Sequence, residues 1–184
     1  MPRINPIDHK TASGDTKQLL DGVKAQLGVV PNIFATLVQS PKALEGFLAF
    51  NAALGQGWLS AQLREQIALT VAGANSCDYC ASAHTALGRG AGVKADELGR
   101  NLLGQSQDGK TQAALSFVRK VVEQRGQVAD ADLAELRTAG FGEGEIVEIV
   151  THIGVNTFTN YFNHIAGTEI DFPLVVAGQA AHAA

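Results

Sequence analysis

The sequence predicts an all-α protein. Of its 184 residues, 46% are hydrophobic but only 6% are aromatic. Apolar residues recur every three or four positions, and no segment alternates apolar and polar residues as a half-buried strand does. This composition and spacing favour packed helices, and the length fits a single domain with a sizeable core.

Capping and stop signals divide the chain into helices in order. Ser40-Pro41 and Ser60 are N-cap signals, Gly28 is a stop signal, and Asn75-Ser76 is a cap signal for the next helix. The helices are predicted over residues 16–27, 32–38, 41–54, 61–73, 77–87, 94–103, 110–125, 130–139, 143–155 and 157–167. We expect residues 1–15 to be an extended lead-in, residues 16–175 to form one domain and residues 176–184 to be a flexible tail.

The charge pattern excludes several classes of partner. The formal net charge is −4, and lysine and arginine are scattered along the chain. This predicts no binding to nucleic acid or to an anionic membrane surface. No apolar run approaches the roughly 18 residues that a spanning helix needs, and Met1–Pro6 shows no signal-peptide core. We therefore expect a cytoplasmic protein.

Both cysteines lie in one short stretch, Cys77-Asp78-Tyr79-Cys80, which is followed by His84. In a helix, Cys77, Cys80 and His84 would share one stripe, at i, i+3 and i+7. Two thiols one turn apart can close a disulfide, and an imidazole one turn further can take a proton. A C-x-x-C pair in a cytoplasmic chain indicates catalysis or metal binding more than a structural disulfide.

The residues alone leave open which thiol is activated. The positive end of the helix dipole favours charge on Cys77, whereas the i+4 spacing to His84 favours Cys80. Glu65 lies twelve positions before Cys77. It would approach the site only if the chain folds back near Gly73–Ser76.

The segment around the cysteines matches a second segment eighty positions later. Glu65, Cys77, Cys80 and His84 then fall on Glu145, Thr157, Asn160 and His164. This predicts a two-helix unit that occurs twice, once with thiols and once without. Glu145 and His164 would either belong to a structural pseudo-repeat, which we favour, or meet in a polar contact.

The pattern Glu65-x11-Cys77-x2-Cys80-x3-His84 resembles the signature of the AhpD-like alkylhydroperoxidases, in the carboxymuconolactone decarboxylase superfamily. Val30-Pro31-Asn32, Ser40-Pro41 and Asn163-His164 resemble its peroxidase-related branch. The resemblance implies an AhpD-like helical fold that assembles as dimers, trimers or hexamers. It also implies a thiol peroxidase, without metal or haem, that reduces a small hydroperoxide and is regenerated by an external dithiol of lipoyl or thioredoxin type.

The same resemblance implies the role of each site residue. Cys80 would be the peroxidatic cysteine and Cys77 the resolving one, His84 would draw the proton from Cys80, and Glu65 would complete the relay. One departure is visible at Tyr79, where family members can carry a second histidine. A neutral phenol is no base near pH 7, so this departure bears on peroxidase efficiency.

Other interpretations compete with this one. Cys77, Cys80, His84 and Glu65 could instead be zinc ligands, or the cysteines could be inert buried residues. A carboxymuconolactone-type lyase would need acid–base residues and no thiols, and a non-enzymatic redox sensor would change shape or assembly on oxidation. His152 and His164 fit polar helix residues better than ligands. Aromatic residues that could line a pocket, though their spacing favours the core, are Phe47, Phe50, Trp58 and Tyr79.

Overall fold

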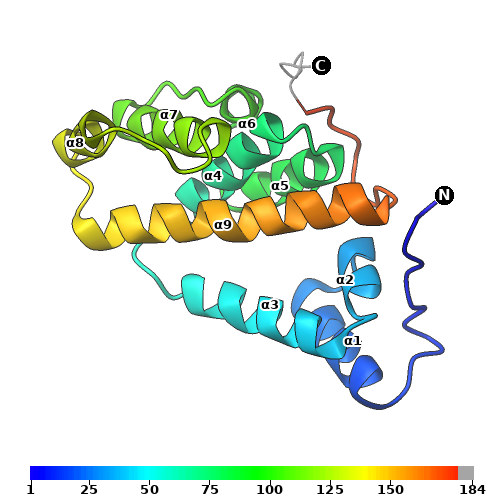
Figure 1. The fold of residues 1–184 in the computed structure, drawn as a ribbon. Coiled ribbons are helices and arrows are strands. Elements are labelled where there is room, and N and C mark those ends of the chain that lie inside the picture. Colours follow the sequence, from blue (N-terminus) through cyan, green and yellow to red (C-terminus); the bar gives the residue numbers. More distant parts are fainter. Residues whose placement is uncertain (178–184) are drawn as a thin grey trace. The chain divides into compact units, whose positions relative to one another are not determined.

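A computed structural model describes residues 1–177 of the chain. Within this range the structure holds nine α-helices and no strand (Figure 1). The all-α prediction is therefore confirmed. The helices fall into two compact units, which are described separately below. None of these helices is both long enough and apolar enough to cross a membrane.

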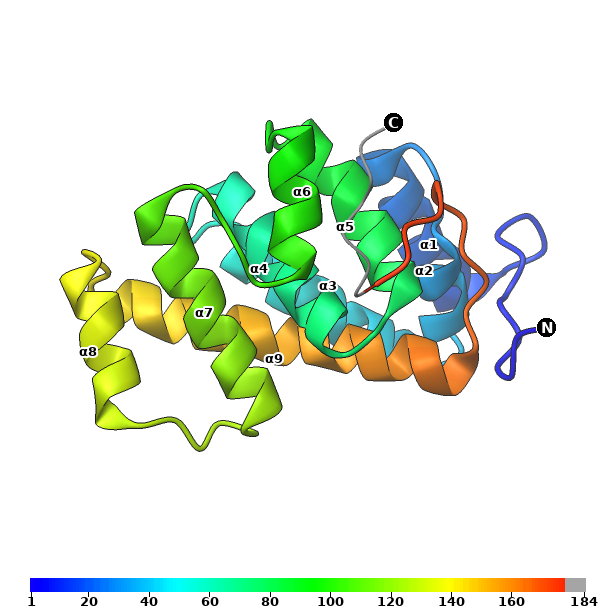
Figure 2. The same ribbon diagram turned by 90° about the horizontal axis from the view of Figure 1, so that it is seen from above.

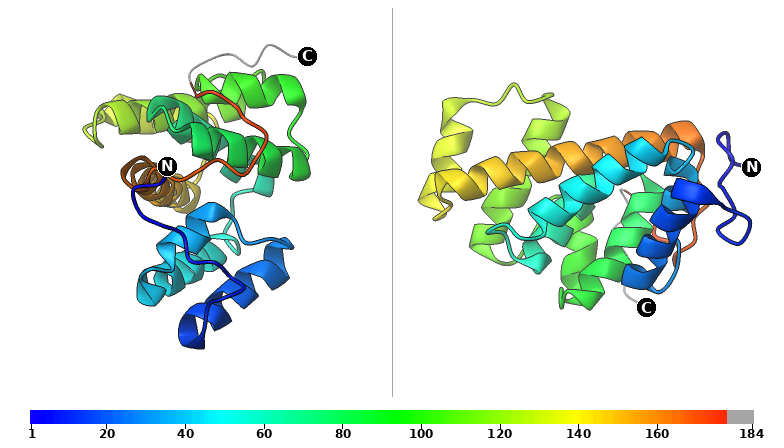
Figure 3. Two further views of the ribbon diagram at one scale, coloured as in Figure 1. Left: turned by 90° about the vertical axis from the view of Figure 1, so that its right-hand side faces the viewer. Right: turned by 90° about the horizontal axis from the view of Figure 1, so that it is seen from below.

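The N-terminal unit comprises Met1–Gln56 and Tyr161–Asp171. Its helices are α1 (Gly14–Leu27), α2 (Asn32–Leu37) and α3 (Pro41–Leu54), seen in blue and cyan in Figure 3. Two sequence signals act as predicted: Gly28 ends α1 with φ +79°, and the Ser40 side chain accepts a hydrogen bond from Ala43 N–H at the start of α3. The small core of this unit consists of Leu20, Leu37, Val38 and Leu44.

The second unit, here called the cysteine unit, comprises Gly57–Asn160 and the C-terminal segment from Phe172. Its complete helices are α4 (Ala61–Ala74), α5 (Asp78–Gly90), α6 (Ala95–Leu102), α7 (Gly109–Glu123) and α8 (Asp130–Thr138). The helix α4 is central, because it contacts α5, α6 and α7 (Figure 2). The helix α9 (Glu143–Ala166) contributes its residues up to Asn160 to this unit.

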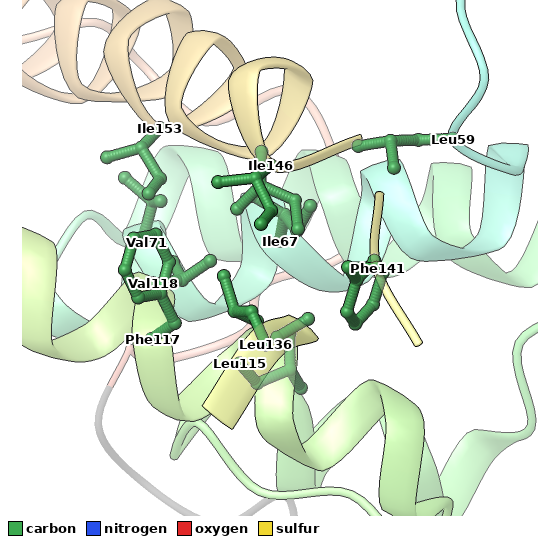
Figure 4. Packing of buried hydrophobic residues seen from close by; sticks show 12 residues of the cluster. Leu59, Ile67, Val71, Leu115, Phe117, Val118, Leu136, Phe141, Ile146 and Ile153 are labelled. Atoms are coloured by element: carbon green, nitrogen blue, oxygen red, sulfur yellow. The ribbon is translucent and has the colours of Figure 1, made fainter. Parts of the chain in front are cut away.

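The core of the cysteine unit forms where α4, α7, α8 and α9 meet. Ile67 and Val71 of α4 are fully buried and pack in one cluster with Val118 of α7 and Ile149 and Ile153 of α9 (Figure 4). Full burial of such a side chain stabilises the fold by about 1.5–3 kcal/mol. Ile67 and Val71 lie on a different face of α4 from Glu65.

The second copy of the two-helix unit is a single helix, which corrects the predicted repeat. The helix α9 runs without a break through Gly154, Val155 and Asn156, where the first copy turns between α4 and α5. In the first copy the turn residue is Ser76, with φ +54°. Its counterpart Asn156 stays helical and donates a side-chain hydrogen bond to the His152 carbonyl, 2.8 Å away.

The continuous helix also determines which contacts Glu145 can make. Glu145 and His164 lie nineteen positions apart on α9, so they cannot form the contact that a folded-back chain would allow. The Glu145 carboxylate instead accepts a hydrogen bond from Gly142 N–H and forms an ion pair with Lys110. It therefore caps the start of α9, in agreement with a structural pseudo-repeat.

The close approach of α4 to α6 requires a glycine at position 73. A Cβ atom on Gly73 would lie 1.8 Å from the carbonyl oxygen of Leu102 in α6. Because backbone cannot move aside cheaply, we expect Gly73→Ala to lower the free energy of unfolding by about 3 kcal/mol. Urea unfolding monitored by circular dichroism measures the change.

Gly46 in the interior of α3 is the matched control for this prediction. A Cβ atom there would meet nothing within 4 Å. Gly46→Ala should therefore raise the free energy of unfolding by about 0.5–1 kcal/mol, because alanine is the better helix former. Equal stabilities for the two variants would contradict the close approach.

Candidate active site

The two cysteines lie at the joint between α4 and α5. The helix α4 ends in a turn in which Ser76 adopts a left-handed conformation, Ser76 N–H bonds the Gly73 carbonyl, and Cys77 N–H bonds the Ala72 carbonyl, at 3.2 and 2.9 Å. These two bonds form a Schellman motif, with Ser76 in the position that glycine usually occupies. The chain then enters α5 directly, so Cys77 is at once the last residue of one motif and the N-cap of the next helix.

This arrangement corrects the predicted cap. Asn75-Ser76 does not cap α5; the N-cap is Cys77, whose Sγ accepts a hydrogen bond from Cys80 N–H at 3.3 Å. A left-handed serine is hard to foresee, because glycine or asparagine usually fills that position. The helix also continues to Gly90, beyond the predicted end near residue 87, and turns at Gly92 with φ +87°.

The two thiols are adjacent, unbonded and buried. The Sγ atoms lie 2.7 Å apart, within hydrogen-bonding distance of each other. The exposed fractions are 1% for Cys77 and 2% for Cys80. A disulfide bond is about 2.05 Å long. A small shift of either side chain would therefore bring the sulfurs to bonding distance.

The surroundings of Cys77 favour its thiolate. The pKa of Cys77 is lowered below its usual value, first by the hydrogen bond from the Cys80 side chain and further by Cys80 N–H and the nearby His84. Burial and the Asp78 carboxylate oppose this shift. These hydrogen bonds, together with the position of Cys77 at the N-terminus of α5, favour negative charge on Cys77.

Glu65 and His84 form a direct pair. The turn at residues 75–77 folds α5 back along α4 and brings His84 Nδ1 to 2.8 Å from Glu65 Oε2. A carboxylate can only accept, so this contact places the imidazole proton on Nδ1 and leaves Nε2 as the lone-pair nitrogen. Both side chains are about one-fifth exposed.

Gly88 allows α6 to pack closely against α5. It follows His84 by one helical turn, and a Cβ atom there would lie 2.7 Å from Leu98 Cδ2 and 3.6 Å from Glu65 Cβ. The glycine-rich sequence around Gly88 predicts a turn. Its role is instead close packing between helices beside the Glu65–His84 pair.

The aromatic residues considered for a pocket lie in different settings. Tyr79 is buried and makes an edge-to-face contact with Phe172 of the C-terminal segment, with ring centroids 5.8 Å apart. Phe47 packs against Phe34, Phe50 is partly exposed, and Trp58 is 74% exposed. Among residues 1–177, no group of three or more histidine, cysteine or acidic side chains is arranged to hold a metal ion.

The C-terminal segment lies against the first turn of α5. Val175 N–H donates to Ser82 Oγ at 2.9 Å, and Ala177 N–H donates to Asp78 Oδ1 at 2.8 Å. The tail predicted over residues 176–184 therefore begins with contacts to the cysteine helix. Its residues 178–184 lie outside the described part of the chain.

Comparisons with known proteins agree with this fold and motif. The sequence profile of the Carboxymuconolactone decarboxylase family matches residues 41–124, which include Glu65, Cys77, Cys80 and His84. No curated protein sequence matches the chain significantly.

Several solved structures share the whole fold. The AhpD-core, peroxidase-related protein of Ralstonia eutropha JMP134 is 28% identical, with a TM-score of 0.82 over 92% of each chain. A peroxidase-related protein of Silicibacter sp. TM1040 is 24% identical, with a TM-score of 0.79 over 91% of this chain and 92% of that one. The debrominase Bmp8, solved as a cysteine-to-alanine variant in complex with 2,3,4-tribromopyrrole, is 19% identical, with a TM-score of 0.79 over 92% of this chain and 91% of that one.

The chain combines an all-helical fold with a C-x-x-C pair at a helix N-terminus and a glutamate–histidine pair between the same two helices. The AhpD-core protein of Ralstonia eutropha shares this fold. The family profile over residues 41–124 and the shared fold together support placing the chain among the AhpD-like proteins of the carboxymuconolactone decarboxylase superfamily.

Proposed function

We propose that this protein is a thiol-dependent hydroperoxide reductase that cycles between a dithiol and a Cys77–Cys80 disulfide. The observation that carries the proposal is the 2.7 Å separation of two unbonded sulfurs at the N-terminus of α5. The Glu65–His84 pair beside them supplies an oriented base. The similarity to the peroxidase-related protein of Ralstonia eutropha supports the same class of reaction.

The first half of the cycle forms a sulfenic acid. His84 Nε2 accepts one proton from the dithiol, and the remaining proton is shared between the two sulfurs. We assign the attack to Cys80, as the family resemblance implies, with the shared proton on Cys77. The Cys80 thiolate attacks the terminal oxygen of the hydroperoxide, the O–O bond breaks, and the alkoxide takes the proton from His84. The products are a Cys80 sulfenic acid and an alcohol.

The second half closes the disulfide. The Cys77 sulfur attacks the Cys80 sulfenic acid, an S–S bond forms, and the hydroxyl group leaves as water with the Cys77 proton. The sum is one hydroperoxide and two thiols converted to alcohol, water and disulfide. An external dithiol, of lipoyl or thioredoxin type, then reduces the disulfide by exchange.

The setting of the reaction follows from the same chemistry. A dithiol that must be reduced in each cycle suits the cytoplasm, where thiols are kept reduced. We propose a homo-oligomer, either a dimer, a trimer or a hexamer. The exposed Phe50 and Trp58 side chains support burial of further apolar surface in an assembly.

Intact mass before and after one equivalent of cumene hydroperoxide, with free thiols alkylated, tests the proposal. We expect a loss of two hydrogens and protection of both cysteines from alkylation. Elemental analysis of the same sample checks for zinc. Thiols that stay free, or stoichiometric zinc on the cysteines, would overturn the proposal. A disulfide that forms once but is never turned over with dithiothreitol present would favour a redox sensor instead.

A further inference from the structure

Two hydrogen-bonded contacts fix the register of α9 against α4 within the cysteine unit. At the start of α4, the Glu148 carboxylate accepts hydrogen bonds from Trp58 N–H and Leu59 N–H at 2.9 and 3.1 Å. At its end, Asn75 donates a side-chain hydrogen bond to Asn160 Oδ1 at 3.2 Å. The two helices therefore run alongside each other over this stretch.

His152 lies between these two contacts, one helical turn after Glu148. It is only 6% exposed, and its Nε2 atom is fully buried without a hydrogen-bond partner among the described residues. The charged groups that act on its imidazole are Arg64, Glu148 and Glu65. The Glu65 carboxylate, which holds His84, is thus one of the charges that act on His152.

A buried polar atom without a partner is costly, by about 1–3 kcal/mol. Its presence within range of the Glu65 charge needs an explanation that an ordinary core position does not provide. Burial is the main cause of the lowered pKa of His152, and the Arg64 charge adds to it. The imidazole is therefore neutral at pH 7, so its two nitrogens provide one donor and one acceptor.

We propose that His152 Nε2 is a further hydrogen-bonding position of the dithiol site, which binds the oxygen of a small hydroxylic molecule beside Glu65. This molecule is the hydroperoxide, with the alcohol that it yields, or a water molecule that connects His152 to the Glu65 carboxylate. The inference rests on the proposed function, because both molecules belong to the hydroperoxide reaction. His152 is in this view a positioning residue from α9, an element that carries no part of the C-x-x-C motif.

The variant His152→Leu separates this role from a structural one. Leucine is apolar and removes the unpartnered atom, so stability at pH 7 should stay equal or rise. The rate of thiol oxidation by hydrogen peroxide, followed by stopped-flow fluorescence or by alkylation, should fall by about tenfold, the equivalent of one lost hydrogen bond of about 1.4 kcal/mol. His152→Gln, which keeps a polar group at the end of the side chain, should recover most of that loss.

Thr85→Val is the matched control. Thr85 Oγ1 is another buried atom of the cysteine unit that lacks a partner among residues 1–177, and valine has nearly the same shape. Its removal should leave the oxidation rate unchanged. A His152→Leu protein that is as stable and as fast as the wild type would overturn the inference, while the disulfide test above would still stand. A wild type that forms no disulfide would instead remove the proposed function.

A measurement on the wild type covers the case in which His152→Leu fails to fold. The imidazole ¹⁵N resonance of His152 is recorded while tert-butanol, the product of tert-butyl hydroperoxide, is added. A saturable shift of Nε2 identifies the organic molecule as the ligand. No shift, together with a slow and folded His152→Leu variant, identifies water. If the leucine variant unfolds, the apolar variant His152→Met takes its place, and no shift together with a wild-type rate in that folded variant overturns the inference.

The pH dependence of stability reports separately on the neutral state of His152. The unfolded chain takes up a proton near the ordinary histidine pKa of 6.5, whereas the folded protein does so only at lower pH. Folding stability contributed by this group is therefore present above pH 6.5 and is lost as the pH falls below it. His152→Leu should lose less stability than the wild type between pH 7 and pH 5.

Discussion

Replacing Cys80 with serine is expected to abolish the catalytic consumption of hydroperoxide. The substitution removes the sulfur assigned to the attack, and no intramolecular disulfide can form without it. It also removes the thiol that forms a hydrogen bond with Cys77 Sγ and lowers the pKa of Cys77. Loss of cumene hydroperoxide in the presence of dithiothreitol measures the effect, which should reach the background rate of the protein-free reaction. Unchanged turnover would contradict the assignment of roles.

The companion variant Cys77→Ser distinguishes the attacking sulfur from the resolving one. Serine is a good N-cap, so the start of α5 should keep its hydrogen bond to Cys80 N–H. With Cys80 as the attacking sulfur, one equivalent of peroxide leaves a sulfenic acid on Cys80, which dimedone labels and mass spectrometry locates. A dimedone adduct on Cys77 in Cys80→Ser, with none on Cys80 in Cys77→Ser, would reverse the two roles. Cys77→Ala is the weaker choice, because it also removes the cap.

Removing the proton relay is expected to have the second largest effect. His84→Ala should lower the rate of thiol oxidation by about 10²-fold or more, the usual contribution of a general acid–base group. Glu65→Gln keeps a side chain of the same shape against His84 Nδ1 but loses the carboxylate that fixes the tautomer. We expect a smaller loss, of about tenfold. Stopped-flow oxidation by hydrogen peroxide between pH 5 and pH 9 measures both.

The relay variants need a control for charge and for folding. Glu45→Gln removes a carboxylate of α3 that pairs with Lys42 on the surface, where a salt bridge contributes little. It should leave the rate unchanged. The double variant of Glu65 and His84 should be no slower than His84→Ala alone, because the glutamate acts through the histidine. If both single variants unfold, the pair is structural and the relay is wrong.

The local signals of the sequence predicted most of the fold. Ser40 and Ser60 cap α3 and α4 through their side chains, as expected from their positions before a helix. The sequence also predicted that a turn near residues 73–76 would bring Glu65 back towards the cysteine helix, where it contacts His84. These features depend on the local sequence of one helix or on contacts between two helices that are consecutive in the chain.

Features that depend on tertiary contacts were less predictable. The turn at Ser76 requires a left-handed serine, which is uncommon, and it made Cys77 rather than Asn75 or Ser76 the N-cap. The equivalent position Asn156 satisfies its side chain on the preceding turn of α9 and does not break the helix. The sequence pattern indicates an ordinary polar helix residue at His152, since its distinguishing feature, a buried nitrogen without a partner among residues 1–177, is visible only in the folded chain.

The deep burial of Cys77 and Cys80 should separate the two halves of the proposed redox cycle in time. A molecule as small as hydrogen peroxide can diffuse through brief packing fluctuations, whereas a protein dithiol needs a local opening large enough to admit a second sulfur. The rate of disulfide reduction should therefore be limited by that opening. At high concentrations of the reductant, this rate should depend only weakly on the concentration. The disulfide would then outlast the peroxide pulse that produced it, so the oxidised fraction would report recent exposure and not the momentary balance of thiols in the cell.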